Sequence, residues 1–354
     1  MFKRIVSKIN RIRAQRNLLR AREFESINEE RLVVENFPPE AKVSLSESEA
    51  MQFDTLWSWT GLKPSHKEIE IFKHYRGFDA RYLTHYQYLP VLAHALNNYR
   101  WTKIFEHKSL IGFLPSEGAL KVPRCYVRSI AGELYGERRD QIMVREAIER
   151  CAGQPVIVKD SSNTSGGKSV EILPKVTEAD LKRRSGRDFV VQELVTQHSS
   201  IAAFNPSSLN TFRVTTLYLN GKFSVLSIIF RMGKKGMKVD NWGAGGIIVG
   251  VQPDGRLHDT GYDIKMNEFS GVNGIKFVES TIDFMPKILK AIEEDHIHRY
   301  SLCKFIGWDI AVNEKGEPVL IEVNSSQPGV IGEQLCTGPI FGERFEEVIE
   351  YCKR

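Results

Sequence analysis

Three residues near the end of the chain carry oxygen-bearing side chains that could bind a metal ion together: Asp309, Glu322 and Asn324. They lie in two short segments, residues 306–312 and 319–324, in which side chains alternate along the chain. Alternation with period two is typical of β-strands. The two segments are close in sequence, so they predict a β-hairpin.

The turn of this hairpin decides which side chains meet. If Lys315-Gly316 forms a two-residue turn, which suits glycine at its second position, then Asp309 lies directly opposite Glu322. Asn324 then shares their face, and opposite side chains are about 5 Å apart at Cβ. The other face would be apolar and carry Trp308, Ile310, Val312, Val319, Ile321 and Val323.

Two carboxylates at this spacing repel each other unless a cation lies between them. Oxygen ligands without a neighbouring His or Cys suit Mg²⁺ that is held jointly with the phosphates of a nucleotide. The alternative is an acidic outward face on a half-buried hairpin. The pattern alone leaves both interpretations open.

A second candidate site follows Lys159, which ends the apolar strand segment 155–159. The next residues include Ser165, Gly166 and Gly167, which let backbone N–H groups approach phosphate oxygens closely. The loop is not a Walker A motif, because Ser162 stands where that motif needs glycine and a strand pattern follows the loop in place of a helix. We expect a hairpin loop that closes over phosphates; the alternative is an ordinary hairpin tip.

The elements that must position these residues predict an α+β chain. Residues 1–100 are expected to be mostly helical, residues 101–192 to carry Lys159 and its loop, and residues 193–354 to carry the metal hairpin. Strands over 211–218 and 223–230 would pair around Asn220-Gly221. The helices that flank these strands are expected at residues 139–151, 282–292 and 343–351.

Composition places few limits on the class of protein. The chain has 354 residues, 42% of them hydrophobic and 26% charged, and a net charge of +5, which is ordinary for a globular protein. Its five cysteines are scattered, which favours a reducing cytoplasm. Beyond its N-terminal segment, the chain has no basic stripe interleaved with aromatic residues, the pattern typical of nucleic-acid binding. No nucleic-acid partner is therefore expected.

Positive charge is concentrated at the N-terminus. Residues 1–24 combine apolar residues at helical spacing with a run of basic residues that precedes the first acid, Glu23. Such a basic amphipathic helix contacts an anionic membrane surface or a partner, or it packs on its own protein. The basic residues are Lys3, Arg4, Lys8, Arg11, Arg13, Arg16, Arg20 and Arg22.

Lys159, the glycine loop, the segment Gln192-Glu193-Leu194 and the late Asp309…Glu322-x-Asn324 occur in the order and spacing of ATP-grasp enzymes, which this chain resembles over roughly residues 70–345. More narrowly, residues 209–214 and 239–241, followed by Gly245-Gly246, resemble the sugar-transfer-associated ATP-grasp family. The resemblance implies two α+β subdomains that clasp ATP, preceded by a helical N-terminal region.

The resemblance also implies roles for particular residues. A first ATP lysine would be Lys108, although His107 stands where the family has aspartate and Lys103 is an alternative. Backbone groups of residues 192–195 would meet adenine, and Arg213 and Arg231 would neutralise the transferred phosphoryl group, unless they form surface salt bridges. The remaining implied contacts are His198 with the ribose, Asp240-Asn241 lining the edge of the site, and two Mg²⁺ ions held by Asp309, Glu322 and Asn324.

The implied activity is that of an ATP- and Mg²⁺-dependent ligase that joins a small-molecule carboxylate to an amine or thiol through an acyl phosphate and releases ADP. The family association suggests sugar-linked substrates and polysaccharide or glycoconjugate biosynthesis. A kinase of the same fold that phosphorylates a hydroxyl group is the first alternative. A non-catalytic scaffold at the inner face of the membrane, contacting it through residues 1–24, is the second.

Overall fold

A computed structural model describes residues 22–38, 43–62, 65–111, 118–162 and 170–354. The chain divides into two compact units. One combines the chain up to Leu96 with the C-terminal stretch Gly329–Arg354, and the other runs from Asn97 to Pro328. The basic segment that was predicted at the N-terminus lies outside the described residues as far as residue 21.

The first unit is helical, as the sequence predicts. Ser46 begins one of its helices with a capping box, accepting from the backbone of Glu49 while the Glu49 side chain bonds back to Ser46. The C-terminal helices group with it: Trp57 packs edge-on against Phe345. Its helices are a helix over 22–35, α2 (Glu47–Trp57), α3 (Lys67–Arg76), α4 (His85–Gln87), the π-helical η3 (Tyr88–Leu92), α5 (Ala93–Leu96), α12 (Ile331–Thr337) and α13 (Phe345–Cys352).

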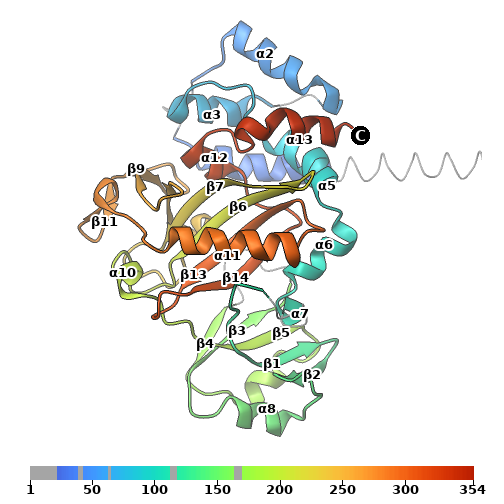
Figure 1. Cartoon of the computed structure of the whole chain (residues 1–354), viewed down its shortest axis with the longest axis vertical. Coiled ribbons are helices and arrows are strands. Elements are labelled where there is room, and N and C mark those ends of the chain that lie inside the picture. The colour runs from blue at the N-terminus through green and yellow to red at the C-terminus, as the bar shows by residue number, and fades with distance from the viewer. Residues whose placement is uncertain (1–21, 39–42, 63–64, 112–117, 163–169) are drawn as a thin grey trace, which may run out of the picture. The chain divides into compact units, whose positions relative to one another are not determined.

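The larger sheet of the second unit is antiparallel, with strand order β10-β9-β8-β7-β6-β13-β14. The helix α11 (Met285–His298) crosses one of its faces (Figure 1). Its apolar side packs on a core that includes Phe212, Phe230 and Trp308. The strands are β6 (Thr211–Leu219), β7 (Lys222–Met232), β8 (Ile247–Val251), β9 (Leu257–Tyr262), β10 (Glu268–Phe269), β13 (Phe305–Val312) and β14 (Pro318–Asn324).

The hairpin predicted around Asn220-Gly221 is confirmed, and it joins β6 to β7. Both turn residues have positive φ, 52° and 74°. Such a turn matches the right-handed twist of the flanking strands, and Asn-Gly is the pair that tolerates it best. The register shifts once between Thr215 and Thr216, so the turn and this bulge together set which β6 side chains face the site.

A buried polar chain anchors the centre of β13. Trp308 Nε1 donates to Thr216 Oγ1 (2.8 Å), and this hydroxyl donates to His296 Nδ1 (2.9 Å). His296 Nε2 in turn donates to the carbonyl of Cys303 (2.8 Å). Burial lowers the pKa of His296 to about 4, so the ring stays neutral at physiological pH. Each side-chain polar atom of Trp308, Thr216 and His296 is therefore hydrogen-bonded, and these bonds hold the strand that carries Asp309 in place.

The predicted pairing of Asp309 with Glu322 is confirmed, but the predicted turn is wrong. Asn313 and Glu317 close a three-residue loop in place of a two-residue one, since Asn313 N donates to Glu317 O at 3.0 Å. A bulge after Asp309 absorbs the extra residue, so that Ile310 pairs with Leu320. Consequently the core takes Leu320, and Ile321 is only half-buried.

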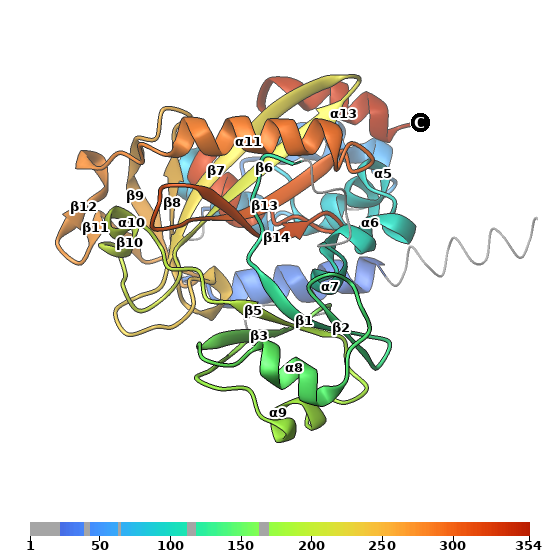
Figure 2. The ribbon, with the colours of Figure 1, turned by 60° about the horizontal axis from the view of Figure 1, so that its bottom comes forward.

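The smaller sheet of this unit has the order β2-β1-β5-β3-β4 and is also antiparallel. The helices α8 (Val144–Arg150) and α9 (Glu178–Lys182) cover one of its faces (Figure 2). Its strands are β1 (Cys125–Ile130), β2 (Glu133–Gly136), β3 (Val156–Asp160), β4 (Glu171–Leu173) and β5 (Phe189–Glu193). Short elements complete the unit: α6 (Tyr99–Glu106), α7 (Lys108–Ile111), α10 (Ser199–Ala202), β11 (Gly271–Val272) and β12 (Ile275–Lys276).

Two predicted helix boundaries need correction. The helix expected from residue 139 begins only at Val144, because Arg139 has a positive φ of 67° inside the turn that returns from β2. The helix expected over 282–292 begins at Met285, with proline at its first turn, and runs on to His298. Within the described residues, no helix is both long and apolar enough to cross a membrane.

Candidate active site

Asp309 lies at the centre of a buried ion-pair network. Arg213 stands beside it on β6, in direct register. Arg213 Nε donates to Asp309 Oδ1 at 2.5 Å, and Arg231, from β7, approaches Oδ2 to 2.9 Å. The Asp309 side chain is only 8% exposed. Both predicted phosphoryl-binding arginines thus converge on the predicted metal ligand.

Thr211 and Asp240 hold the Arg231 guanidinium in addition to Asp309. Its Nε and one terminal nitrogen donate to Thr211 Oγ1 at 3.0 and 2.7 Å. The Thr211 hydroxyl donates in turn to Asp240, whose Oδ2 is 3.8 Å from Arg231 Nε. Arg231 therefore touches two carboxylates, Asp309 and Asp240, and one hydroxyl.

The two carboxylates have pKa values that shift in opposite directions. Burial raises the pKa of Asp309, but the guanidiniums of Arg213 and Arg231 outweigh it and bring the pKa down to about 2. Burial also raises the pKa of Asp240, and there Arg231 and Thr211 offset it only in part. Asp309 therefore stays ionised throughout the physiological range.

Glu322 is engaged by a lysine from an earlier part of the chain. Lys108 Nζ donates to Glu322 Oε1 at 3.0 Å, and Lys108 begins the short helix α7. Lys103, the alternative first lysine, lies exposed on α6. The structure therefore places Lys108, and not Lys103, beside the acidic pair.

Lys159 lies buried on β3, 8% exposed. Burial lowers its pKa to about 8, and the positive charge of Lys108 adds to this effect while Glu322 opposes it. Burial and the charge of Lys108 together disfavour the ammonium form of Lys159 more than the negative charge of Glu322 favours it. Lys159 is therefore suited to bind an anion.

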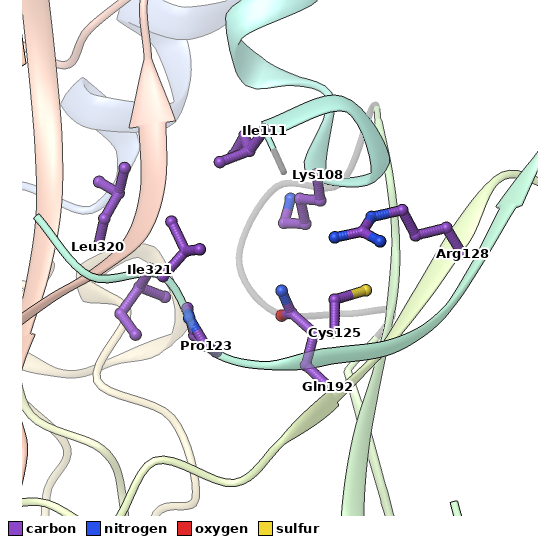
Figure 3. A pocket seen from close by; sticks show the side chains of 9 residues that line it. Lys108, Ile111, Pro123, Cys125, Arg128, Gln192, Leu320 and Ile321 are labelled. Atoms are coloured by element: carbon purple, nitrogen blue, oxygen red, sulfur yellow. The ribbon is translucent and has the colours of Figure 1, made fainter. Parts of the chain in front are cut away.

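A small cavity of about 20 Å³ opens between the two sheets of this unit beside these groups (Figure 3). The amide of Gln192, the ammonium group of Lys108 and the guanidinium of Arg128 point into it in Figure 3. The lining residues are Lys108, Ile111, Val122, Pro123, Cys125, Arg128, Gln192, Leu320 and Ile321.

The donor set fits a hard divalent cation. Asp309 and Glu322 are directly opposed on neighbouring strands, and Asn324 shares their strand face. Asn324 donates its Nδ2 to the carbonyl of Gly307 at 3.3 Å, so its Oδ1 is the atom that could bind a metal. Two carboxylates and one amide oxygen are the donors that Mg²⁺ prefers.

The other predicted site residues have varied surroundings. The backbone N–H of Glu193 donates to the carbonyl of Arg124, and the backbone N–H of Arg124 donates to the Glu193 carboxylate, both at 2.9 Å. Leu194 follows directly after β5. His198 stacks edge-on against Phe284 at 4.7 Å, and Asn241 accepts from the backbone of Ala244 to begin a short 3₁₀ turn. Their predicted contacts with a nucleotide stay predictions. The predicted phosphate-loop residues Ser165, Gly166 and Gly167 lie outside the described part of the chain.

Four residues of the site were not predicted. Thr211 could have been found, because it precedes Arg213 by two positions on one strand and so shares its face. Gly307 leaves room for Arg213: a Cβ there would lie 3.2 Å from the Arg213 Cδ. Arg128 lines the cavity, and Glu106 accepts from the backbone N–H groups of Ser325 and Ser326 at 2.7 and 2.5 Å, directly after β14.

The pKa of Lys159 gives a testable pH dependence. A protonated ammonium group binds phosphate and a neutral amine does not, so nucleotide affinity should fall as the pH rises through about 8. Between pH 7 and pH 9 we expect a loss of about tenfold, the fall in the protonated fraction. Calorimetric titration of ADP across this range measures it. Lys159→Arg keeps its charge and should show a flat profile; an equal fall in that variant would assign the pH dependence to another group.

Two antiparallel sheets with flanking helices, which bring two lysines, two arginines and an acidic pair together, define an ATP-grasp fold. Residues 186–349 match the family described as "Sugar-transfer associated ATP-grasp". Over these residues the match confirms the resemblance stated from the sequence. No curated protein matches the chain.

Solved structures show a weak likeness. An L-amino acid ligase from Bacillus licheniformis is 14% identical, with a TM-score of 0.40 over 71% of this chain and 48% of that one. The VanG D-Ala:D-Ser ligase from Enterococcus faecalis is 12% identical, with a TM-score of 0.39 over 74% and 63%. The N5-carboxyaminoimidazole ribonucleotide synthetase from Thermotoga maritima is 10% identical, with a TM-score of 0.36 over 63% and 42%. This chain spans less than two thirds of the length of each of them.

Proposed function

We propose that this chain is an ATP- and Mg²⁺-dependent ligase that joins a carboxylate to an amine and releases ADP and phosphate. One observation supports this most strongly: two lysines and two arginines lie around an acidic pair on neighbouring strands, and one of the lysines, Lys108, also lines the cavity. The cations are Lys108, Lys159, Arg213 and Arg231, and the acidic pair is Asp309 and Glu322.

The chemistry needs such an arrangement because a carboxylate is a poor electrophile. In the first step a carboxylate oxygen of the substrate attacks the terminal phosphorus of ATP. The bond from that phosphorus to its bridging oxygen breaks, and ADP leaves. In the second step the amine attacks the acyl carbon, phosphate leaves, and the amine loses a proton. The protein contributes mainly positioning and charge neutralisation.

Each charged group has a place in this scheme. Lys108 and Lys159 would bind phosphate oxygens, and Arg213 and Arg231 would neutralise the group in transfer. Asp309, Glu322 and Asn324 would hold the metal. Mg²⁺, when bound, supplies charge neutralisation and orientation for the phosphate oxygens.

The substrates are proposed to be sugar-linked. The support is the description of the matched family, which associates it with sugar transfer. A role in polysaccharide or glycoconjugate assembly follows from the same description. The carboxylate and the amine are best found by screening candidates for ADP release.

Trapping with hydroxylamine tests the reaction class. The protein is incubated with ATP, Mg²⁺, hydroxylamine and the carboxylate that stimulates ADP release, and a ligase yields the hydroxamate of that carboxylate. ADP release that yields a phosphorylated hydroxyl group and no hydroxamate would show a kinase instead. An absence of ATP binding would favour a non-catalytic role. Glu322→Gln, taken through the same protocol, is the control for uncatalysed trapping.

A further inference from the structure

The groups expected to bind the metal are already engaged by cations of the protein. Both oxygens of Asp309 are held by guanidiniums, at 2.5 Å from Arg213 and 2.9 Å from Arg231. One oxygen of Glu322 is held by Lys108 at 3.0 Å. A divalent cation that bound here would have to displace these groups from the carboxylates.

The charges of this network also oppose a bare metal ion. Among the described residues, three carboxylates and four cations lie in this site, so these seven groups carry one net positive charge when Lys159 is protonated. The negative members are Asp240, Asp309 and Glu322, and the positive ones are Arg213, Arg231, Lys108 and Lys159. Asp309 and Lys159 are both buried. A metal cation and the cationic side chains of the site would therefore repel each other more strongly than they would in water.

We propose that Arg213, Arg231 and Lys108 serve as counter-ions of Asp309 and Glu322, and that a metal ion replaces them only when the phosphates of a nucleotide bind these cationic side chains instead. Metal and nucleotide then bind as a coupled pair, and neither carboxylate binds a divalent cation with useful affinity alone. This inference rests on the proposed function, since it concerns the same site, and it adds the order in which the site can be filled.

Arg231 has other acceptors besides Asp309, so it can lose this contact and stay paired. When its contact with Asp309 is lost, it still has the Thr211 hydroxyl at 2.7 and 3.0 Å and the Asp240 carboxylate at 3.8 Å. A buried guanidinium that keeps acceptors avoids most of the cost of an unpaired buried charge. Asp240 and Thr211 are therefore positioning residues that let Arg231 release Asp309 without leaving the site.

Binding of Mn²⁺ measured by electron paramagnetic resonance tests the inference without any turnover. The full chain is titrated with Mn²⁺ alone and again with ADP present, and the loss of the free Mn²⁺ signal is recorded. We expect ADP to raise the Mn²⁺ affinity of the protein by at least about tenfold, within the usual range of coupling between sites. The binary Mn²⁺–ADP complex is subtracted with a sample that lacks protein.

Two variants sharpen the test. Lys108→Met frees Glu322, and Arg231→Met frees one oxygen of Asp309, so each should bind Mn²⁺ without ADP more tightly than the parent chain does. Lys103→Met is the matched control, because Lys103 is exposed on α6, and it should leave Mn²⁺ binding unchanged. Since Glu322 is partly exposed, 28%, Lys108→Met should fold even if the buried arginine variant does not.

The outcomes separate this inference from the proposed function. If the parent chain binds Mn²⁺ equally well with and without ADP, the counter-ion inference is overturned while the nucleotide and metal site stands. Unchanged Mn²⁺ affinity in a folded Lys108→Met variant would overturn it in the same way. If no Mn²⁺ binds even with ADP, the proposed function itself fails.

Discussion

Replacing Glu322 with glutamine should lower turnover by more than about a hundredfold and leave the fold intact. Loss of a group that only orients a metal ligand costs about 10- to 100-fold, so loss of a charged ligand itself should cost more. Glutamine has nearly the same shape but no charge. It would weaken both the metal site and the contact with Lys108, 3.0 Å away.

Stability should change less in this variant than in Asp309→Asn, because Glu322 is 28% exposed and the glutamine side chain still offers an oxygen that can accept from Lys108. The rate of ADP release and the thermal unfolding midpoint of the same preparation check both halves. Glu317→Gln is the matched control: Glu317 lies at the other end of the same hairpin and pairs with Lys121 at 2.7 Å. Turnover in Glu322→Gln equal to that of this control would contradict the metal assignment.

The pairing of Asp309 with Glu322 was predictable because strand alternation and a short connection leave few registers. The bulge beside Asp309 was not predictable. A two-residue turn and a three-residue turn with one bulge give the same pairing at that position, and alternation does not distinguish them. The apolar stretch Val319-Leu320-Ile321 hides the difference, since each of its residues is compatible with the core. The predicted face of Ile321 was therefore wrong, although Asp309 and Glu322 were paired as expected.

Contacts between residues distant in sequence were harder to predict. Nothing in the sequence around Lys103 and Lys108 says which of them reaches Glu322, more than 200 positions away, because the answer depends on how α6 and α7 end. The shared role of Arg231 follows from β7 lying beside β6, which the Asn220-Gly221 turn did indicate. Asp240 was expected only at the edge of the site, because a loop residue has no periodicity from which its direction can be read.

Replacing Asp309 with asparagine should destabilise the protein by about 3–5 kcal/mol, the cost of removing one partner from a buried ion pair. Asp309 and Glu322 are both proposed metal ligands, yet their surroundings differ. Asp309 is 8% exposed and neutralises two guanidiniums, whereas Glu322 is 28% exposed and pairs with one lysine. Asparagine would leave the buried guanidiniums of Arg213 and Arg231 without the carboxylate that they share.

The pKa of Asp309, about 2, sets the pH range in which this loss is measurable. A carboxylate whose pKa is lower in the folded state contributes its stability above its unfolded pKa, about 3.9, and loses it as the pH falls toward 2. Urea unfolding at neutral pH should therefore show the full difference between Asp309→Asn and the parent chain, and the two should converge at low pH.

A compensating substitution separates lost charge balance from lost packing. Adding Arg231→Met to Asp309→Asn removes one of the guanidiniums left in excess, so the double variant should recover part of the stability lost by the single one. Glu322→Gln, measured alongside, should unfold close to the parent chain. If Asp309→Asn unfolds at the same urea concentration as Glu322→Gln, then Asp309 does not hold the two arginines in solution, and the network of buried ion pairs described for this site is wrong.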